Sequence, residues 1–283
     1  MDVSIKNLKH ITIGELVEVF NDSFSDYILP LNLTEESLSF KLFSELIDLE
    51  LSIGAYVNEK LIGFMLTGVK TQEGEVYYYN AGTGVIPTYR GQRIVALMYD
   101  YALPLWKDRG KSGCLILEVI KGNDKAIRAY CAQGYEINRD LLCFRGEIKE
   151  LEVTVDSLKI EQREIIDWNV VSDFWDIQPS WQNDTVVLKR AKDDVCYQVA
   201  IDRENVIGYI AYHKSSGKVF QIAVSKENRR RGIGKLLLHQ VARTLNKPIV
   251  ITNVDESSAQ MIGLMNAVGL KLFITQHEMV KRY

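Results

Sequence analysis

Apolar residues recur along the chain at the two spacings that are typical of strands and helices. Residues 53–58, 61–70 and 75–86 are largely apolar runs separated by polar turns, which predicts three successive strands. Further on, apolar side chains spaced i, i+3, i+4, i+7 and i+11 predict the buried face of a helix. These side chains are Ile94, Leu97, Met98, Tyr101 and Leu105. The pattern therefore indicates a domain built from both strands and helices.

The flanking segments complete one structural unit. Residues 12–25 and 34–48 are expected to be helical, and Thr34 is a favourable N-cap because two glutamates follow it in the first turn. The other elements expected in this half are a strand over 115–120, a helix over 123–131 that stops at Gly134, and strands to about residue 148.

The second half of the chain repeats the first. The matched anchors are Ile62-Gly63-Phe64 with Ile207-Gly208-Tyr209, Val85 and Arg90 with Val224 and Arg229, and Gly134 with Gly269, at offsets of 145, 139 and 135. Because the offset drifts by only ten residues, two copies of one domain explain the pattern better than chance does. We expect an N-terminal domain over residues 1–150, a C-terminal domain over 151–283, and a junction near Lys149 to Leu158.

The second copy preserves the order of elements. Apolar spacing predicts a helix over 233–245 and a strand over 249–254, after a strand over 220–224. Each copy is therefore expected to have an α/β fold, a mixed sheet packed by helices on both faces.

The composition agrees with two globular domains. The chain has 283 residues, of which 47% are hydrophobic and 25% charged, and domains average roughly 150 residues. No stretch approaches 18 consecutive apolar residues, and Met1-Asp2-Val3-Ser4 leads into no secretion signal. We therefore expect a cytoplasmic protein with no membrane association.

Cysteine, histidine and charge exclude other classes of function. The four cysteines, at 114, 131, 143 and 196, match neither a metal knuckle nor a dense disulfide framework. The four histidines show no paired spacing, so no metal site is expected. The net charge of −3 is the opposite of the basic balance that broad nucleic-acid binding needs. Any anionic ligand must be held locally.

A glycine-rich turn in the second half has the features of an anion site. Residues 229–234, Arg-Arg-Arg-Gly-Ile-Gly, lie between a predicted strand and a predicted helix. Glycine allows a phosphate to approach the backbone closely, the N-terminus of a helix offers unpaired N–H groups, and arginine adds charged donors. The alternative is a solvated basic turn in which glycine only starts the helix. The matching position of this turn in the two copies favours the anion site.

The motif Val-x4-Arg-x-x-Gly-x-Gly at 224–234 resembles the acetyl-CoA signature of the GNAT superfamily of N-acyltransferases. The order of elements is also similar, over about residues 4–148 and again 155–283, so the whole chain resembles a tandem of two GNAT-like domains. The resemblance implies that each has a central mixed, largely antiparallel sheet with helices on both faces. It also implies acetyl-CoA as co-substrate, with loop amides on the pyrophosphate and the preceding strand, at Val85 or Val224, facing the acetyl and pantetheine arm.

The first copy departs from the signature. It keeps Val85 and Arg90, but Arg93 and Val95 occupy the two glycine positions. Backbone amides of Arg or Val still donate, although close approach becomes harder if either Cβ faces the phosphates. The residues that the resemblance assigns to cofactor binding are Val85, Arg90, Gly91, Gln92, Arg93, Ile94, Val95 and Asn123 in the first copy, and Val224, Arg229, Arg230, Arg231, Gly232, Ile233 and Gly234 in the second.

Two side chains of the first copy are candidates for proton transfer. Glu118 lies in the middle of an apolar strand, and burial disfavours a charged carboxylate, which suits a general base. The alternative is a strand-edge glutamate paired with a lysine or arginine. Tyr130 follows on the next helix, where the alternative role is a core aromatic packed with Ala126 and Ile127.

The spacing Glu-x11-Tyr further resembles the ribosomal-protein alanine acetyltransferase branch of the family, which implies Glu118 as base, Tyr130 as acid and Asn123 on the cofactor side. The second copy has Asn253, Met265 and Ser258 at these three positions. Neither Asn253 nor Met265 exchanges a proton at neutral pH. The two copies are therefore complementary: one keeps the proton-transfer pair and the other keeps the glycine loop.

Three interpretations of function follow. The first is an N-acetyltransferase that acts on a primary amine by direct attack, with Glu118 taking a proton through water, the Val85 N–H holding the oxyanion and Tyr130 assisting the thiolate. The second places catalysis in the C-terminal copy and makes the N-terminal copy a scaffold. The third is a non-catalytic acyl-CoA-binding sensor or interaction module.

The acceptor is left open by the sequence. Trp168, Trp175 and Trp181 lie where the resemblance expects the acceptor site of the second copy, with core packing as the alternative. In the first copy, Asp22, Asp26 and Tyr27 occupy the corresponding region and are candidates to meet a cationic amine; solvated loop acids are the alternative for the two aspartates. A peptide or a small-molecule amine is expected as substrate, and the oligomeric state is unknown.

Overall fold

The computed structural model describes residues 2–29, 31–110, 113–148 and 158–283. Of the expected junction between the copies, Lys149 to Leu158, only Leu158 falls among the described residues.

The first half of the chain folds in the predicted order. Its elements are β1 (Ser4–Asn7), α1 (Ile13–Ser23), α2 (Glu35–Ser44), β2 (Ile53–Val57), β3 (Lys60–Gln72), β4 (Glu75–Val85), α3 (Ile94–Asp108), β5 (Gly113–Ile120), α4 (Asp124–Ala132) and β6 (Glu136–Gly146). Thr34 is the N-cap of α2, as expected, and Ser37 completes its capping box. The helix ends four residues earlier than predicted, before Leu46, which adopts a left-handed φ of +60° that a helix does not continue.

The second half has the corresponding elements. They are β7 (Lys159–Arg163), α5 (Trp168–Val171), α6 (Thr185–Arg190), β8 (Val195–Asp202), β9 (Asn205–His213), β10 (Lys218–Val224), α7 (Ile233–Leu245), β11 (Ile249–Asp255), α8 (Ala259–Val268) and β12 (Lys271–Arg282). The hairpin turns preceding the two Gly63 and Gly208 anchors both use consecutive residues with positive φ, Asn58-Glu59 and Arg203-Glu204. Identical turn geometry supports the internal repeat.

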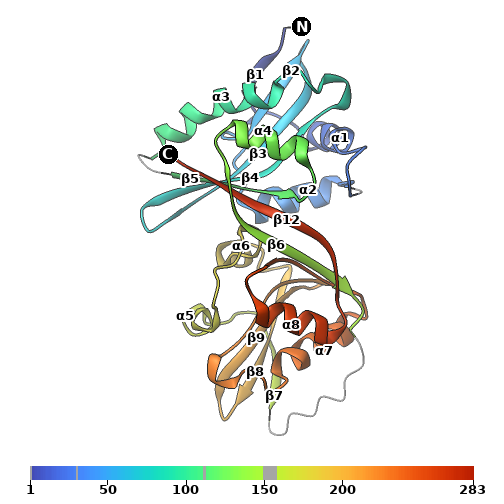
Figure 1. Cartoon of the computed structure of the whole chain (residues 1–283), viewed down its shortest axis with the longest axis vertical. Coiled ribbons are helices and arrows are strands. Elements are labelled where there is room, and N and C mark those ends of the chain that lie inside the picture. The colour runs from blue at the N-terminus through green and yellow to red at the C-terminus, as the bar shows by residue number, and fades with distance from the viewer. Residues whose placement is uncertain (1, 30, 111–112, 149–157) are drawn as a thin grey trace. The chain divides into compact units, whose positions relative to one another are not determined.

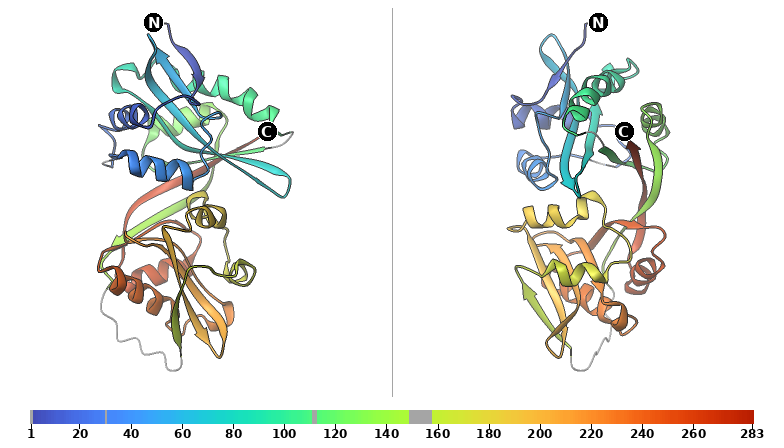
Figure 2. Two further views of the ribbon diagram at one scale, coloured as in Figure 1. Left: turned by 180° about the vertical axis from the view of Figure 1, so that it is seen from behind. Right: turned by 90° about the vertical axis from the view of Figure 1, so that its left-hand side faces the viewer.

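In the first compact unit, the strands are ordered β1-β2-β3-β4-β5, with the end of β12 beside β5 (Figure 1). All pairs from β1 to β4 are antiparallel, and β4 and β5 are parallel. Helices α1 and α2 cover one face of the sheet and α3 and α4 the other (Figure 2), each over its own apolar cluster. This is the mixed, largely antiparallel sheet that was expected.

In the second compact unit, the order is β6-β11-β10-β9-β8-β7, and only β10 and β11 pair in parallel. Helices α7 and α8 bury Leu237, Val241 and Met265 on one face. On the other face, the indole of Trp168 meets the rings of Tyr197 and Tyr209 edge-on.

The compact units are not two consecutive stretches of chain. The first comprises the residues up to Asn138 together with His277–Tyr283, and the second comprises Arg139–Gln276. The two copies have exchanged their last strands: β6 pairs antiparallel with β11, and Tyr283 forms backbone hydrogen bonds in both directions with Gly113 at the start of β5. The compact units thus differ from the division at residue 150, which separates the sequence copies.

We predict that deleting residues 277–283 destabilises the first unit although these residues end the second copy. The deletion removes the strand beside β5 and the fully buried Met279, and loss of one such core side chain alone typically costs about 2–5 kcal/mol. Hydrogen exchange should accelerate in β5 and remain slow in β10. Unchanged protection of β5 would show that the exchanged strand does not support this unit.

Candidate functional site

The two parallel strands of the first unit separate in the middle of the sheet. Their pairing ends at Asn80 with Leu117, although β4 continues to Val85 and β5 to Ile120. At this point the β3–β4 register shifts and leaves Ala81 as an extra residue. Because such a β-bulge bends and twists its strand, it carries the end of β4 away from β5. The result is an opening bordered by both strands.

The second unit opens in the same way. Parallel pairing of β10 with β11 ends at Val219 with Ile251, and the β9–β10 register shifts at Phe220. Phe220 and Ala81 are separated by the same offset as Val224 and Val85. The bulge and the opening are therefore features of the repeated domain.

Each opening exposes one backbone donor at the end of the bulged strand. Ile86 N–H donates to the Ile62 carbonyl, so this is a hydrogen-bonded pair of the antiparallel ladder. Because such pairs alternate, the Val85 N–H points to the opposite edge, where β5 has left. In the second unit the Ser225 N–H donates to the Ile207 carbonyl of β9. The Val224 N–H therefore points away from β9, toward the opening.

The carbonyl of Val85 also lacks a partner strand, and an arginine side chain donates to it instead. Arg90 Nε donates to the Val85 carbonyl at 3.0 Å, and its Nη2 donates to the Ser23 carbonyl at 2.8 Å. Its two terminal nitrogens also form a bidentate ion pair with Asp26 at 2.7 and 2.8 Å. Arg90 thus links the end of β4 to the segment after α1.

Arg229 makes the same bridge in the second unit. Its Nε donates to the Val224 carbonyl at 3.2 Å, Nη2 to the Phe174 carbonyl at 2.8 Å, and Nη1 pairs with Asp176 at 2.7 Å. Both arginines were predicted to bind the cofactor, whereas these contacts commit most of their donors within the protein. The spacing Val-x4-Arg places the arginine on the valine carbonyl in both units, and the cofactor role of the two arginines stays a prediction.

The bridge also accounts for Asp26, a candidate for meeting the amine. Hydrogen bonding with Arg90 holds the pKa of the Asp26 carboxyl below its usual range. Asp22 is exposed. Tyr27, by contrast, turns toward the site: burial raises its pKa, and its hydrogen bond with the Asn123 side chain acts in the opposite direction.

The two glycine-rich turns have the same backbone conformation despite their different residues. Gly91 and Arg93 have φ of +78° and +59°, and their counterparts Arg230 and Gly232 have +64° and +84°. Each copy thus places one glycine and one arginine in two left-handed positions. Neither α3 nor α7 has a side-chain N-cap, so the first N–H groups of both helices are available to an anion.

Side chains around the turns differ between the copies. In the first copy, Gly91, Gln92 and Arg93 are exposed, Val95 is half-buried, and Ile94 packs into the core. In the second copy, Arg231 is directed to Asn228 and Asp202.

A cavity of about 870 Å³ extends from the turn of the second copy through its opening. This volume lies within the range of small-molecule and cofactor pockets. Its walls come from the glycine turn, both separated strands, α8 and the segment before α6. The lining includes Arg230, Gly232, Ile233, Gly234, Lys235, Gln221, Val224, Thr252, Ser258, Met261, Trp175 and Gln178.

Glu118 follows the last paired residue of β5 and lies at the edge of the first opening. It is half-buried, and its Oε2 accepts a hydrogen bond from the Tyr79 hydroxyl at 3.2 Å. Tyr79 is only 2% exposed. The buried tyrosine fixes the orientation of the carboxylate relative to the opening.

Tyr130 reaches the same opening from α4. Burial raises the pKa of Tyr130 to about 12, against hydrogen bonds with Thr83 and Asn80 that lower it. Asn80 also donates to Thr83 at 2.8 Å and to Tyr99 at 3.0 Å, and it accepts the Gly82 N–H at 3.1 Å. The polar groups freed by the bulge are thus satisfied by a network that holds the Tyr130 hydroxyl.

Asn123 is the N-cap of α4, and its Oδ1 accepts from the Ala126 N–H at 3.3 Å. The Asn123 side chain also forms a hydrogen bond with Tyr27, which joins the start of α4 to the segment after α1. The network of Tyr79, Asn80 and Thr83 was not singled out from the sequence. The signal was present in the polar stretch Asn80-Ala-Gly-Thr83, which interrupts an apolar strand.

The second copy lacks this proton-transfer machinery. Asn253 is 8% exposed and has a left-handed φ of +62°. Its amide donates to Ser180 and accepts from Gln276 at 3.0 and 2.9 Å. Met265 is fully buried, and Ser258 lines the cavity. Asn253 and Met265, which align with Glu118 and Tyr130 in sequence, carry no proton that ionises near neutral pH. By strand pairing, Thr252 follows the last paired residue of β11, as Glu118 does in β5, and it lines the cavity.

The tryptophans of the second copy have different surroundings. Trp175 lines the cavity and donates to the Tyr209 hydroxyl at 2.6 Å, which in turn donates to Gln221. Trp168 packs against the same tyrosine ring, and Trp181 is buried.

Among the described residues, no group of three or more His, Cys, Asp or Glu side chains is arranged to hold a metal ion. None of the described helices has the length and apolar character required to span a membrane.

Comparison with known proteins links the fold to one family. The model of the acetyltransferase (GNAT) family matches residues 14–135 and again 163–270. A GCN5-related N-acetyltransferase from Sphaerobacter thermophilus is similar in structure, with a TM-score of 0.72 and 14% identity over 99% of this chain and 95% of that one. A tandem GNAT protein from the clavulanic acid biosynthesis pathway has a TM-score of 0.74 and 11% identity, over 99% and 98% of the two chains. At these identities the structures establish the fold. No curated protein sequence matches significantly.

We predict that replacing the bridging arginine is much more harmful than neutralising its partner. Arg90→Gln leaves the Val85 and Ser23 carbonyls without their donor, which typically costs about 1–3 kcal/mol. Asp26→Asn removes only an exposed ion pair and should change stability little. Urea unfolding of both variants, with the matched pair Arg229→Gln and Asp176→Asn, measures this order. Equal losses for Arg90 and Asp26 would contradict the structural bridge.

Proposed function

The chain belongs to the acetyltransferase (GNAT) family, with one match of the family model in each half, and we propose that its first unit transfers an acetyl group from acetyl-CoA to a primary amine. The observation that carries this proposal is that β4 and β5 separate beyond Asn80 and Leu117, with Val85 and Glu118 on the separated ends and Tyr130 hydrogen-bonded to Asn80 and Thr83 of β4. A base, a donor for the leaving group and an oxyanion donor are the three groups that acyl transfer to an amine needs.

Glu118 serves as the proton acceptor for the amine. An ammonium group cannot attack a thioester, so its proton must first move to a base, directly or through water. Tyr79 fixes Oε2 of the carboxylate and makes Glu118 a preorganised acceptor. The amine nitrogen then forms the new N–C bond and loses its second proton to solvent, and the C–S bond of the thioester breaks to leave the amide and the thiolate.

The Val85 N–H stabilises the negative charge that develops on the thioester oxygen. Arg90 supports this role because it occupies the valine carbonyl and leaves the amide as a donor. Loss of one oxyanion donor typically costs about 3 kcal/mol in the barrier. The amide belongs to the backbone, so the residue type at position 85 matters less than the bend in β4.

Tyr130 assists departure of the thiolate by donating a hydrogen bond. With a pKa of about 12 it remains protonated throughout the neutral range. Complete transfer of its proton to sulfur is uphill, because a thiol has an ordinary pKa of about 8.5. Tyr130 is therefore a stabiliser of the thiolate in the first instance, and solvent supplies the final proton.

For the second unit we propose binding of acetyl-CoA without efficient turnover. The cavity, the uncapped start of α7 and the Arg230 and Lys235 side chains on its wall suit a pyrophosphate-bearing ligand. Asn253 and Met265 supply no base or acid. Catalysis in this unit with an already neutral amine is the alternative, and it would leave Glu118 dispensable.

We predict that Glu118→Gln and Tyr130→Phe each lower the rate of acetyl transfer by about 10²–10⁴-fold, the usual contribution of acid–base assistance. Binding of acetyl-CoA should change little, because neither side chain belongs to the turn that is proposed to hold the pyrophosphate. Single-turnover kinetics with a primary-amine panel and calorimetric titration measure the two quantities separately. Full activity in Glu118→Gln would move the chemistry out of the first unit.

We also predict no alkaline loss of rate from Tyr130 below about pH 11. The tyrosine acts in its protonated form, and its raised pKa of about 12 keeps that form populated as the pH rises. The single-turnover rate should therefore rise with deprotonation of the amine and then remain level up to about pH 10. A fall centred near pH 9 to 10 that disappears in Tyr130→Phe would show that burial does not protect the hydroxyl.

A further inference from the structure

Each unit has a segment beside its opening that is attached to the first arginine of the glycine turn. In the first unit it comprises residues 23–27, and in the second residues 174–178; we refer to them as the first and second straps. Each strap is bound by the bridging arginine, Arg90 or Arg229. The second strap and helix α8 both line the cavity. If a CoA thioester occupies the turn and the α8 side, as proposed for this unit, the strap side is the part of the cavity wall that remains for an amine.

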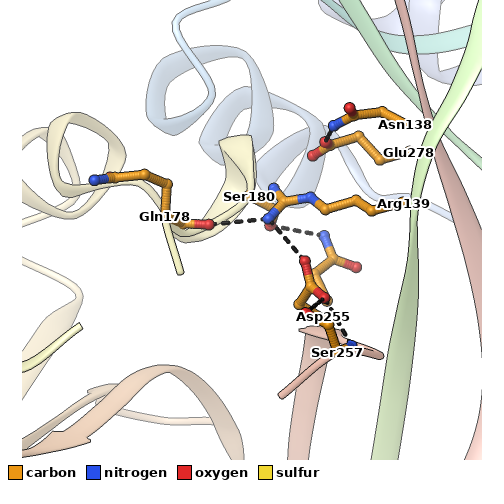
Figure 3. Close-up of polar contacts among 8 residues, drawn as sticks. Asn138, Arg139, Gln178, Ser180, Asp255, Ser257 and Glu278 are labelled. Atoms are coloured by element: carbon orange, nitrogen blue, oxygen red, sulfur yellow. Dashed lines mark hydrogen bonds and ion pairs between the residues drawn. The ribbon is translucent and has the colours of Figure 1, made fainter. Parts of the chain in front are cut away.

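The second strap is fastened by a further cation. Arg139 Nη1 donates to the Gln178 carbonyl at 3.1 Å and contacts Asp255 Oδ2 at 3.3 Å (Figure 3). Asp255 is the last residue of β11, and its carboxylate accepts from the Ser257 amide and hydroxyl at 2.9 and 2.6 Å. The second strap is therefore tied to the ends of both strands that border the opening.

Additional contacts continue this attachment beyond the strap. Ser180 accepts from Asn253, and Asn183 donates to the Thr252 carbonyl at 3.0 Å. Trp175 is anchored to Tyr209. All these partners lie on β9 or on the separated part of β11.

The two bridging arginines hold the straps through similar ion pairs. Arg90 and Asp26 have side chains that are 41% and 57% exposed, and those of Arg229 and Asp176 are 26% and 41% exposed. Arg139 and Asp255 are more shielded, at 20% and 13%, and shielded pairs are screened less by salt and solvent. On the side of β5, the first strap is held by the neutral hydrogen bond of Tyr27 with Asn123. Among the described residues, the shielded Arg139 is therefore the contact that distinguishes the second strap.

We propose that Arg139, acting with Asp255, determines that the second unit binds a CoA thioester but admits no amine. Arg139 is a specificity-determining residue in this account, and it acts by closing the acceptor side of the cavity. The inference rests on the proposed binding of acetyl-CoA in the second unit. This proposal gives a second reason why the second unit would not turn over acetyl-CoA, independent of the absent Glu118 and Tyr130 pair. Even a neutral nucleophile, which needs no base, should be excluded.

Two readouts on the full-length protein test the proposal. The first is backbone hydrogen exchange of the straps, which requires no ligand. The second is attack by hydroxylamine, a small nucleophile that is neutral near pH 7, on bound acetyl-CoA, followed as release of the CoA thiol. The second experiment uses a Glu118→Gln/Tyr130→Phe background with protein in excess. Adding Arg230→Glu/Lys235→Glu, which reverses the two cavity-wall cations proposed to meet the pyrophosphate, identifies the fraction bound in the second unit.

Arg139→Met should accelerate exchange of the second strap about tenfold or more and leave the first strap unchanged, with a smaller effect in Asp255→Asn, which keeps the Arg139 bond to Gln178. Arg90→Met, the matched control, should accelerate the first strap alone. Hydroxylamine should cleave the thioester bound in the second unit slowly. In Arg139→Met the rate of this cleavage should rise at least tenfold.

No response of the second strap to Arg139→Met would overturn the proposal. Rapid hydroxylamine cleavage in the second unit with Arg139 intact would also overturn it. If acetyl-CoA gave no protection that depends on Arg230 and Lys235, the proposed cofactor binding would fail, and the response of strap exchange to Arg139→Met would still decide whether Arg139 fastens the strap.

Discussion

The structure depends on one interruption in the hydrogen bonding of each sheet. A single extra residue, Ala81 or Phe220, bends a strand where its parallel partner would otherwise continue beside it. Backbone groups at such a point lose their partners and must be satisfied in another way. The protein meets this requirement with an arginine on the valine carbonyl, and in the first unit with Asn80 on the amide after the bulge. The valine N–H remains as the donor that a ligand can use.

The two copies have used this common framework differently. In the first, the polar groups around the bulge join Tyr130 in a network, and Tyr79 orients Glu118. In the second, Val219 and Ile222 replace Asn80 and Thr83 in the repeat, and the residues facing the opening fasten a neighbouring segment. A duplicated domain can in this way separate proton transfer from ligand retention while preserving one backbone design.

Much of this organisation was predictable from the sequence, because it is encoded locally. The periodicity of apolar residues gave the strands and helices to within a few residues, and the anchors at Gly63 and Gly208 revealed the repeat. The exchange of β6 and β12 was not predictable, since either copy of the last strand satisfies the same apolar pattern. The contacts of Arg90 illustrate a second limit: the sequence shows a cation beside a glycine turn, but the direction of its side chain depends on Ser23 and Asp26, more than 60 residues away. Its cofactor role stays a prediction. Likewise, the sequence has arginine in one copy and glycine in the other, and only the backbone angles show that Arg93 and Gly232 share a left-handed conformation.

The most direct test of the account is a crystal structure of the full chain with saturating acetyl-CoA. The account predicts a thioester in each opening, with its oxygen at hydrogen-bonding distance, about 2.7–3.2 Å, from the Val85 or Val224 N–H and with the Arg90 and Arg229 bridges intact. Thioester density outside both openings, or continued pairing of β4 with β5 and of β10 with β11 beyond the two bulges, would contradict it.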